Sequence, residues 1–486
     1  MDKLEKIRNI YDKEIRENNL EYYYLDKNKL CCDIQLAPMI YDLIDFDYLG
    51  PIKFLSKYYK DNDSNYYNEL INRNNNLEKP IFIKDFDYDK DEILLQYIKC
   101  IKNMKILLFW PSMDIKNIFD SQITKFLETF GSIHAIKEIN LTSKQMEGII
   151  YQINYDKKEF KNLSNIQKFM NKIEADQSKN KIFVLFYSSD EFVDLENNPI
   201  ILNQLTKIIP NNKQSNVDLN NYIKTINNFT NVIEISQLFC NKNSLRILQY
   251  QRLDRIFNQN FDKSLYNLMT FKNWMYQEIN IIDQIRFLLV SGITLYALGL
   301  RQASDIDIII LPFPRENVRT ENFFKLVDQY LLNSKTRFDE MEAVLKKEDG
   351  WYLGDVKYDY MKDWTAKEWP NLYGAKTMDE TIIDPQFHYY YFGIKMIIPK
   401  AEIKRRIKRN RAAAYADLIA IMHFLKIEID VPIIQKKYWS AHVFKTYDIH
   451  GIKKLYKTIK FYLKKRYDID MNENQIKKYI KNEIFD

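Results

Sequence analysis

The sequence predicts a mixed α/β (α+β) protein built from more than one folded part. The chain of 486 residues is longer than the roughly 250 to 300 residues at which a single hydrophobic core stops growing. Short apolar runs typical of buried strands alternate with apolar stripes of helical period. A hydrophobic share of 46%, with 35 Tyr and 29 Phe, is sufficient to fill packed cores.

We divide the chain into four regions by these patterns: a Tyr-rich N-terminal region over 1–100, an α/β domain over 101–262, a second α/β domain over 263–398 and a basic helical C-terminal domain over 399–486. The last 96 residues carry 22 Lys and Arg against 10 Asp and Glu, although the net charge of the whole chain is only +6. Basic charge is therefore concentrated at the C-terminal end, as expected for a surface that meets phosphates.

The first α/β domain is predicted to begin with a buried strand and to continue with further strands and a helix. The strand spans 104–110 and ends at Pro111. An amphipathic helix follows over 115–130, with Gly131 after its last turn. Three more apolar segments are predicted as strands, over 133–141, 148–155 and 182–187.

The second α/β domain is predicted to open with two helices, over 265–275 and 280–290. A Ser-Gly turn, Ser291-Gly292, then leads into a short helix from Thr294 to Gly299, and an apolar strand starts near Asp305. This last stretch carries the residues that indicate chemistry.

Asp305 and Asp307 are one residue apart on the predicted strand, so they project to the same face. Two carboxylates this close repel each other unless a cation lies between them. Hard divalent cations such as Mg²⁺ prefer these oxygen ligands. Upstream, the turn at Ser291 and Gly292 offers backbone N–H groups to a triphosphate. Ser304 and Arg301 are expected beside the carboxylates.

A Ser-Gly turn, a helix and Asp-x-Asp on a strand, with twelve residues between Gly292 and Asp305, resemble the nucleotidyltransferase superfamily that includes DNA polymerase β and the poly(A) polymerases. The resemblance implies a nucleotidyltransferase-type mixed sheet flanked by helices, with a third carboxylate on a later strand. Asp359 is our choice for it. Asp355 is the rival, because strand alternation puts both on one face.

The resemblance also implies roles for these residues. Asp305, Asp307 and Asp359 would be the catalytic carboxylates and the ligands of two Mg²⁺ or Mn²⁺ ions, with ATP as substrate. The nucleotide would be bound by Ser291, Gly292, Ser304 and Lys395.

The segment 384–398 crowds aromatic residues around His388. One interpretation is a surface that stacks on bases, with Lys395 on a phosphate. The other is an aromatic core helix behind the active site, in which His388 is a packed core residue. No second His lies at metal-ligand spacing.

Seven cations fall within residues 400–411, at the start of a predicted helix that continues from Ala412 to Leu425. We expect Arg405, Arg406 and Arg409 to contact RNA or phosphate. The alternative is a solvated cationic face that pairs with acidic parts of the protein.

Taken together, these features predict a template-independent RNA nucleotidyltransferase that adds AMP from ATP to an RNA 3′ end, similar to the poly(A) polymerases of large DNA viruses. In such an enzyme the preceding α/β domain would be a degenerate nucleotidyltransferase copy, because it has no Asp-x-Asp. Two alternatives stay open: a transferase of the same superfamily that acts on a small or protein acceptor, and a catalytically dead RNA-binding protein.

The expected partners are an RNA 3′ end and a nucleoside triphosphate, with a homodimer or a processivity partner also compatible. Four cysteines without zinc spacing favour a reducing compartment, and no apolar run of about 18 residues occurs. We therefore expect a cytoplasmic protein, or one in a viral factory or virion, without a membrane anchor.

Overall fold

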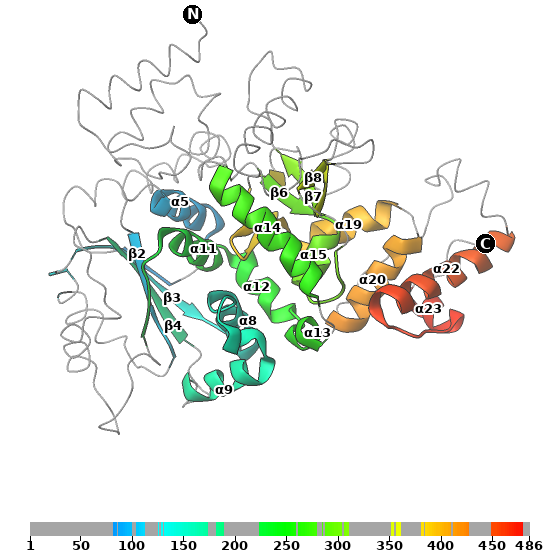
Figure 1. Cartoon of the computed structure of the whole chain (residues 1–486), viewed down its shortest axis with the longest axis horizontal. Helices are drawn as coiled ribbons and strands as arrows, with labels where there is room; N and C mark the ends of the chain where they lie inside the picture. Colours follow the sequence, from blue (N-terminus) through cyan, green and yellow to red (C-terminus); the bar gives the residue numbers. More distant parts are fainter. Residues whose placement is uncertain are drawn as a thin grey trace, which may run out of the picture.

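Two β-sheets, each covered by helices, organise the part of the chain that the structure describes (Figure 1). The computed structural model describes these residues: 81–84, 86–99, 104–111, 125, 128–129, 131–173, 181–188, 223–258, 261–278, 284, 287–303, 306–310, 351–353, 356–360, 381–382, 384–409, 412–426 and 449–479. Most of the Tyr-rich region, residues 1–80, and most of the helix expected over 115–130 lie outside them. The mixed α/β class is confirmed.

The first sheet has five strands in the order β1-β3-β4-β2-β5. Only β1 and β3 run parallel, and the other neighbours are antiparallel. The strands predicted over 104–110, 133–141 and 182–187 are confirmed as β2, β3 and β4. The bounds are β1 (Ile81–Ile83), β2 (Met104–Phe109), β3 (Ser132–Asn140), β4 (Lys181–Ser188) and β5 (Ile223–Ile226).

The prediction of a strand over 148–155 is wrong, because this segment belongs to a helix, α8 (Ser143–Ile153). Thr142 and Gln145 form a capping box that starts the helix. This local helix signal outweighs the short apolar run on which the strand prediction was based. Gly148 faces α12 (Lys242–Tyr250), where an added Cβ would lie 2.9 Å from Leu248. The remaining helical elements before the second sheet are α5 (Tyr88–Lys99), η2 (Lys158–Lys161), α9 (Leu163–Ile173), α11 (Phe229–Phe239) and α13 (Leu253–Asn258).

The second sheet has six strands in the order β10-β11-β6-β7-β9-β8. It is mixed: β11 and β6 are parallel, as are β7 and β9, and the other neighbours are antiparallel. Its bounds are β6 (Phe287–Val290), β7 (Ile306–Ile310), β8 (Trp351–Leu353), β9 (Val356–Tyr360), β10 (His388–Tyr391) and β11 (Ile394–Ile397). For β8 and β9 only the backbone is described.

The helix predicted over 265–275 is confirmed as α14 (Asp262–Glu278), but the helix predicted over 280–290 is wrong at its end. Residues 287–290 form the strand β6, and all four side chains are buried. β6 lies between β11 and β7, so both of its edges are covered, and its four buried side chains show that both of its faces are covered as well. A continuous apolar run is what such a strand requires, and over four residues it cannot be distinguished from a helical stripe.

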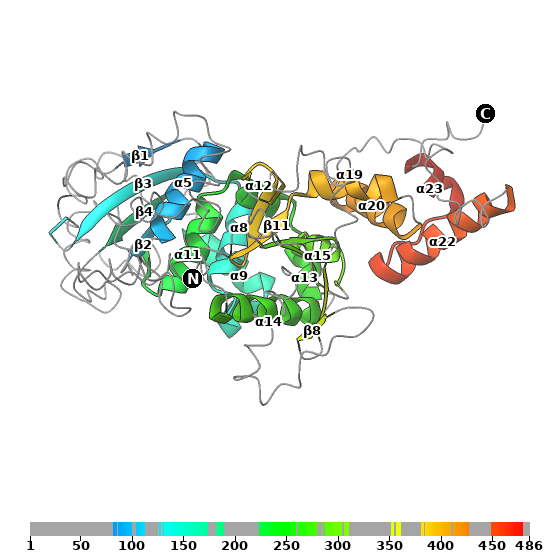
Figure 2. The ribbon, with the colours of Figure 1, turned by 90° about the horizontal axis from the view of Figure 1, so that it is seen from above.

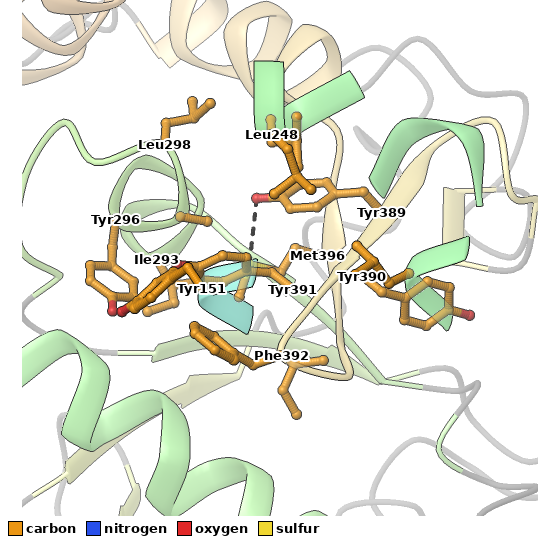
Figure 3. Close-up of a cluster of buried hydrophobic side chains, with 14 of the residues drawn as sticks. Tyr151, Leu248, Ile293, Tyr296, Leu298, Tyr389, Tyr390, Tyr391, Phe392 and Met396 are labelled. Atoms are coloured by element: carbon orange, nitrogen blue, oxygen red, sulfur yellow. Dashed lines mark hydrogen bonds between the residues drawn. The ribbon is translucent and has the colours of Figure 1, made fainter. Parts of the chain in front are cut away.

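The aromatic segment is also a correction, because residues 388–397 form the antiparallel hairpin β10–β11 instead of a core helix. Its side chains are buried beside tyrosines of α8 and α15 (Gly292–Ala297), as Figure 3 shows. Tyr391 contacts Phe392 and Tyr296 edge-on, at ring-centroid distances of 4.6 and 6.2 Å. Packed rings of this kind are core, so they cannot stack on bases.

Helices α11 and α12 join the two sheets. α11 packs on both β2 and β10, and α12 packs on both α8 and β10. The side-chain amide of Asn243 donates to the carbonyls of Pro385 and His388 at 3.0 and 3.1 Å. The apolar core therefore continues from the first sheet into the second, across the boundary that we placed at residue 262.

The order of strands differs between the two sheets. In the first, β2 has antiparallel neighbours on both sides, whereas β6 in the second has a parallel neighbour on one side. The interpretation of the first domain as a degenerate nucleotidyltransferase copy stays a prediction.

The C-terminal region is helical in its described part and lies at the end of the molecule away from the first sheet (Figure 2). The helix predicted to run from 400 to 425 is two helices, α19 (Pro399–Arg409) and α20 (Ala412–Leu425), which pack on each other. α20 then packs on α22 (Ile449–Tyr467), and α22 on α23 (Glu473–Tyr479). Among the described helices, none has the length and apolarity to cross a bilayer.

Candidate functional site

The strand β6, the short helix α15 and the strand β7 bring the Ser-Gly turn close to Asp307. β6 ends at Val290, Ser291 makes the turn, α15 follows, and β7 returns antiparallel to β6. Val290 is the register partner of Asp307. The Ser-Gly turn therefore lies immediately beyond the residue that pairs with the second aspartate of Asp-x-Asp.

Asp307 and Asp359 are register partners on the parallel strands β7 and β9. Paired residues on neighbouring strands lie about 4.8 Å apart and on the same face of the sheet. On β7 the neighbours Ile306 and Ile308 are buried and Asp307 is partly exposed, but Ile309, which shares the face of Asp307, is buried as well.

Ser304, Asp305 and the rival third carboxylate Asp355 lie outside the described residues. Among the side chains that are described, no three His, Cys, Asp or Glu gather as a metal centre. The side chain of Asp359 is not among them, so the observation that bears on the third carboxylate is its backbone register with Asp307.

The turn at Ser291 has an unusual backbone. Its φ of 69° and ψ of −125° lie in a region that non-glycine residues rarely adopt. The side chain makes no capping hydrogen bond to α15, although the Thr294 hydroxyl donates to the Ser291 carbonyl at 2.7 Å. Strained backbone of this kind persists only where surrounding contacts hold it in place, and it is frequent at functional sites.

The Ser291 N–H is not offered to a ligand in this structure, because it donates to Glu402 Oε2 of α19 at 3.2 Å. The predicted contact of this N–H with a triphosphate is therefore not available in this arrangement. On the other side of the turn, Arg301 approaches Gly292, where a Cβ would lie 3.4 Å from both terminal guanidinium nitrogens. The structure therefore brings two groups to the Ser-Gly turn, the Glu402 carboxylate and the Arg301 guanidinium.

A buried network of charges holds Arg301 and Glu402. Arg406 pairs with Glu402 at 3.0 Å and also donates to Asp417 of α20. Asp417 further accepts from the Tyr467 hydroxyl. The network is continued by Arg301 and Arg466, whose nitrogens lie 3.5 and 3.3 Å from Asp417 Oδ1.

Two of the predicted contact residues are corrected by their burial. Arg406 is 5% exposed and serves the charge network, so it does not face RNA. Lys395 is 3% exposed, and its ammonium donates to the Ile382 carbonyl at 2.7 Å, so it does not reach a nucleotide. The side chains of Arg405 and Arg409 lie outside the described residues.

His388 is fully buried at the start of β10, and burial holds its pKa well below the ordinary value. Its imidazole is therefore neutral, and Nε2 lies 3.9 Å from the Glu92 carboxylate. These features make it a packed core histidine.

Glu402 and Asp417 are not among the site residues predicted from the sequence. Asp417 is the only acidic residue in an otherwise apolar helix of 14 residues, and a lone carboxylate in such a helix predicts a buried, paired charge. Glu402 is likewise the only acid in the basic helix α19. These signals were present, but the partners come from the segments flanking α15 and from α19 and α22, which only the fold brings together.

No protein-family profile, curated protein or solved structure matches the chain.

Proposed function

We propose that the protein is a metal-dependent nucleotidyltransferase with a nucleotidyltransferase-type catalytic sheet, and that it adds nucleotides, AMP from ATP first among them, to an RNA 3′ end without a template. The observation that carries the proposal is the register of the second sheet. Asp307 has Asp359 as its partner on one side and, on the other, Val290, the residue before the Ser-Gly turn.

The donor set fits hard divalent cations, because carboxylate oxygens on neighbouring strands are the ligands that Mg²⁺ prefers. Asp307 and Asp359, with Asp305, would hold two such ions. When bound, they would neutralise the triphosphate and lower the pKa of the attacking hydroxyl.

The residues of the chain would contribute positioning and charge. Arg301 lies against the Ser-Gly turn and is partly buried, with a side-chain exposure of 12%. A guanidinium keeps its charge at every physiological pH and donates in a fixed fork, which suits phosphate oxygens. Because Asp417, which is itself held by Arg406, pairs with Arg301, the Arg301 guanidinium would be oriented before the nucleotide arrives.

The test is extension of a labelled RNA oligonucleotide by the purified protein with Mg²⁺ or Mn²⁺ and each ribonucleoside triphosphate in turn. We expect a product ladder with ATP that is lost in Asp307→Asn. Asp156→Asn removes an exposed carboxylate from the loop after α8 and serves as the matched control, with wild-type extension expected.

Extension that survives Asp307→Asn would contradict the proposed site. Absence of extension by the wild-type protein with every nucleotide and both metals would contradict the RNA acceptor. A two-metal site that positions and neutralises the reacting groups predicts a loss of at least about a thousandfold in rate for Asp307→Asn.

A further inference from the structure

Helix α22 turns an apolar side toward the protein and a basic side toward solvent. The buried side consists of Leu455, Tyr456, Ile459, Leu463 and Tyr467. Five exposed residues lie on the opposite side, at the helical positions i, i+3, i+4, i+7 and i+8: Lys457, Lys460, Phe461, Lys464 and Lys465. We call these five residues the α22 face.

The α22 face combines cations with an exposed aromatic ring. Phe461 is 55% exposed, and the Lys465 ammonium lies 5.5 Å from its ring centroid. The ring centroids of Tyr462 and Phe461 lie 5.6 Å apart in an edge-on arrangement, so Tyr462 packs against one side of the Phe461 ring. Lysines that track a phosphate backbone, together with a ring on which a base stacks, are the combination that binds single-stranded nucleic acid.

The acids beside this face hold its lysines only weakly. Asp468 pairs with Lys464 at 2.6 Å and Asp470 with Lys460 at 3.6 Å, and in both pairs the two side chains are largely exposed. Exposed ion pairs contribute little, so phosphate groups can replace these carboxylates.

The burial of the opposite side decides which partner fits. A helix that enters a membrane surface uses a broad apolar face, but the apolar face of α22 is occupied by α20 and α23. A single exposed ring among four lysines suits a stacked base between phosphates.

We propose that the α22 face binds single-stranded RNA, with Phe461 stacked on a base and Lys457, Lys460 and Lys464 on phosphates. The inference rests on the proposed function in taking RNA as the acceptor. It moves the RNA contact from Arg406 of α19, which is buried, to α22. Helix α20 packs on both α19 and α22.

The test measures binding alone, by fluorescence anisotropy of labelled 20-nucleotide oligo(A) and oligo(U) RNA without nucleotide or divalent metal, over a range of KCl concentrations. A variant with Lys457, Lys460 and Lys464 all changed to Gln should bind at least about tenfold more weakly at low salt. Its slope of log affinity against log salt should fall by about 2, because each phosphate contact on a single strand contributes about 0.7.

The matched control changes three exposed lysines of η2 and α9 in the first domain, Lys161, Lys168 and Lys172, to Gln and carries the same net charge. It should bind like the wild-type protein. Equal weakening in the control and in the α22 variant would overturn the proposal, since binding would then follow net charge instead of this surface.

Two further variants separate stacking from charge. Phe461→Ala should bind about tenfold more weakly with an unchanged salt slope, and Phe461→Trp should restore affinity. Asp468→Asn with Asp470→Asn should tighten binding by about threefold or more, because two competing carboxylates are lost. Asn suits position 468, where φ is 54°. Unchanged affinity in Phe461→Ala would overturn the stacking role.

Failure of this inference and failure of the proposed function give different results. If the wild-type protein extends RNA while the α22 variants bind like it, the surface is wrong and the function stands. If no RNA is extended but the α22 variants lose binding, the surface stands and the function is wrong. Vesicles of phosphatidylserine serve as competitor, and binding to them that is tighter than to RNA and depends on Phe461 would overturn the choice of partner.

Discussion

Asp417 is the position at which one substitution should reveal most about this protein. Its side chain is 2% exposed and accepts from Arg406 and Tyr467, with Arg301 and Arg466 also within 3.5 Å. Asp417→Asn keeps the volume but removes the negative charge that these arginines share. Removing one partner of a buried ion pair costs about 3 to 5 kcal/mol, because the other charge stays buried without compensation.

The structure indicates the lower end of this range. Arg406 keeps Glu402 as a partner at 3.0 Å, and Arg466 is partly exposed, so water can solvate it. We therefore expect Asp417→Asn to lower the free energy of unfolding by about 3 kcal/mol. Asp254→Asn breaks the pair of Asp254 with Arg252, whose side chains are 45% and 31% exposed, and should cost less than about 1 kcal/mol.

Urea unfolding followed by tyrosine and tryptophan fluorescence measures both variants, with circular dichroism as a second probe of the same transition. Adding Arg406→Met to Asp417→Asn should not restore the lost stability. The buried Glu402 carboxylate then loses its partner Arg406, while Arg301 and Arg466 still lack Asp417. A loss for Asp417→Asn no larger than that for Asp254→Asn would refute the network as a stabilising element.

Three further outcomes follow from single positions. Ser291→Gly should raise the free energy of unfolding by about 1 kcal/mol, because Ser291 has a φ of 69°; no gain in urea unfolding would show that the turn is not strained. His134 has its pKa lowered to about 4 by burial, so the stability that its neutral form contributes is present above pH 6.5 and is lost as the pH falls toward 4. In His134→Gln the amide can still hydrogen-bond to Ser188, whose hydroxyl lies 2.7 Å from His134 Nε2. Between pH 6.5 and 4 this variant should lose about 2 to 3 kcal/mol less unfolding free energy than the wild-type protein. Urea midpoints that change in parallel with pH in the two proteins would contradict this. Lys395→Met should lower stability by about 1 to 3 kcal/mol by leaving the Ile382 carbonyl without its donor, but should leave the KM for ATP unchanged in the extension assay; a raised KM at full stability would return Lys395 to the nucleotide site.

Several elements could be predicted because their signals are local. The strands β2, β3 and β4 and the helix α14 follow from apolar period alone. Asp307 could be selected because an acid one residue away from another, at the start of an apolar strand, is an uncommon pattern. The errors have local causes too: the run 287–290 is too short to show a period, and the capping box at Thr142 was overlooked.

By itself, the sequence determined the mixed α/β class, the strands β2, β3, β4 and β7 and the order of Ser291, Gly292 and Asp307 along the chain. Only the tertiary structure decided which of these residues are neighbours: Asp307 beside Asp359, Arg301 against Gly292, and Glu402 on the Ser291 N–H. It also decided that Arg406 and Lys395 are buried, whereas the four lysines of the α22 face are exposed. The physical reason is that periodicity and capping act within a few residues of the chain. Burial and strand register depend on partners from other elements, such as Asp359 for Asp307, which pack only when the whole fold forms.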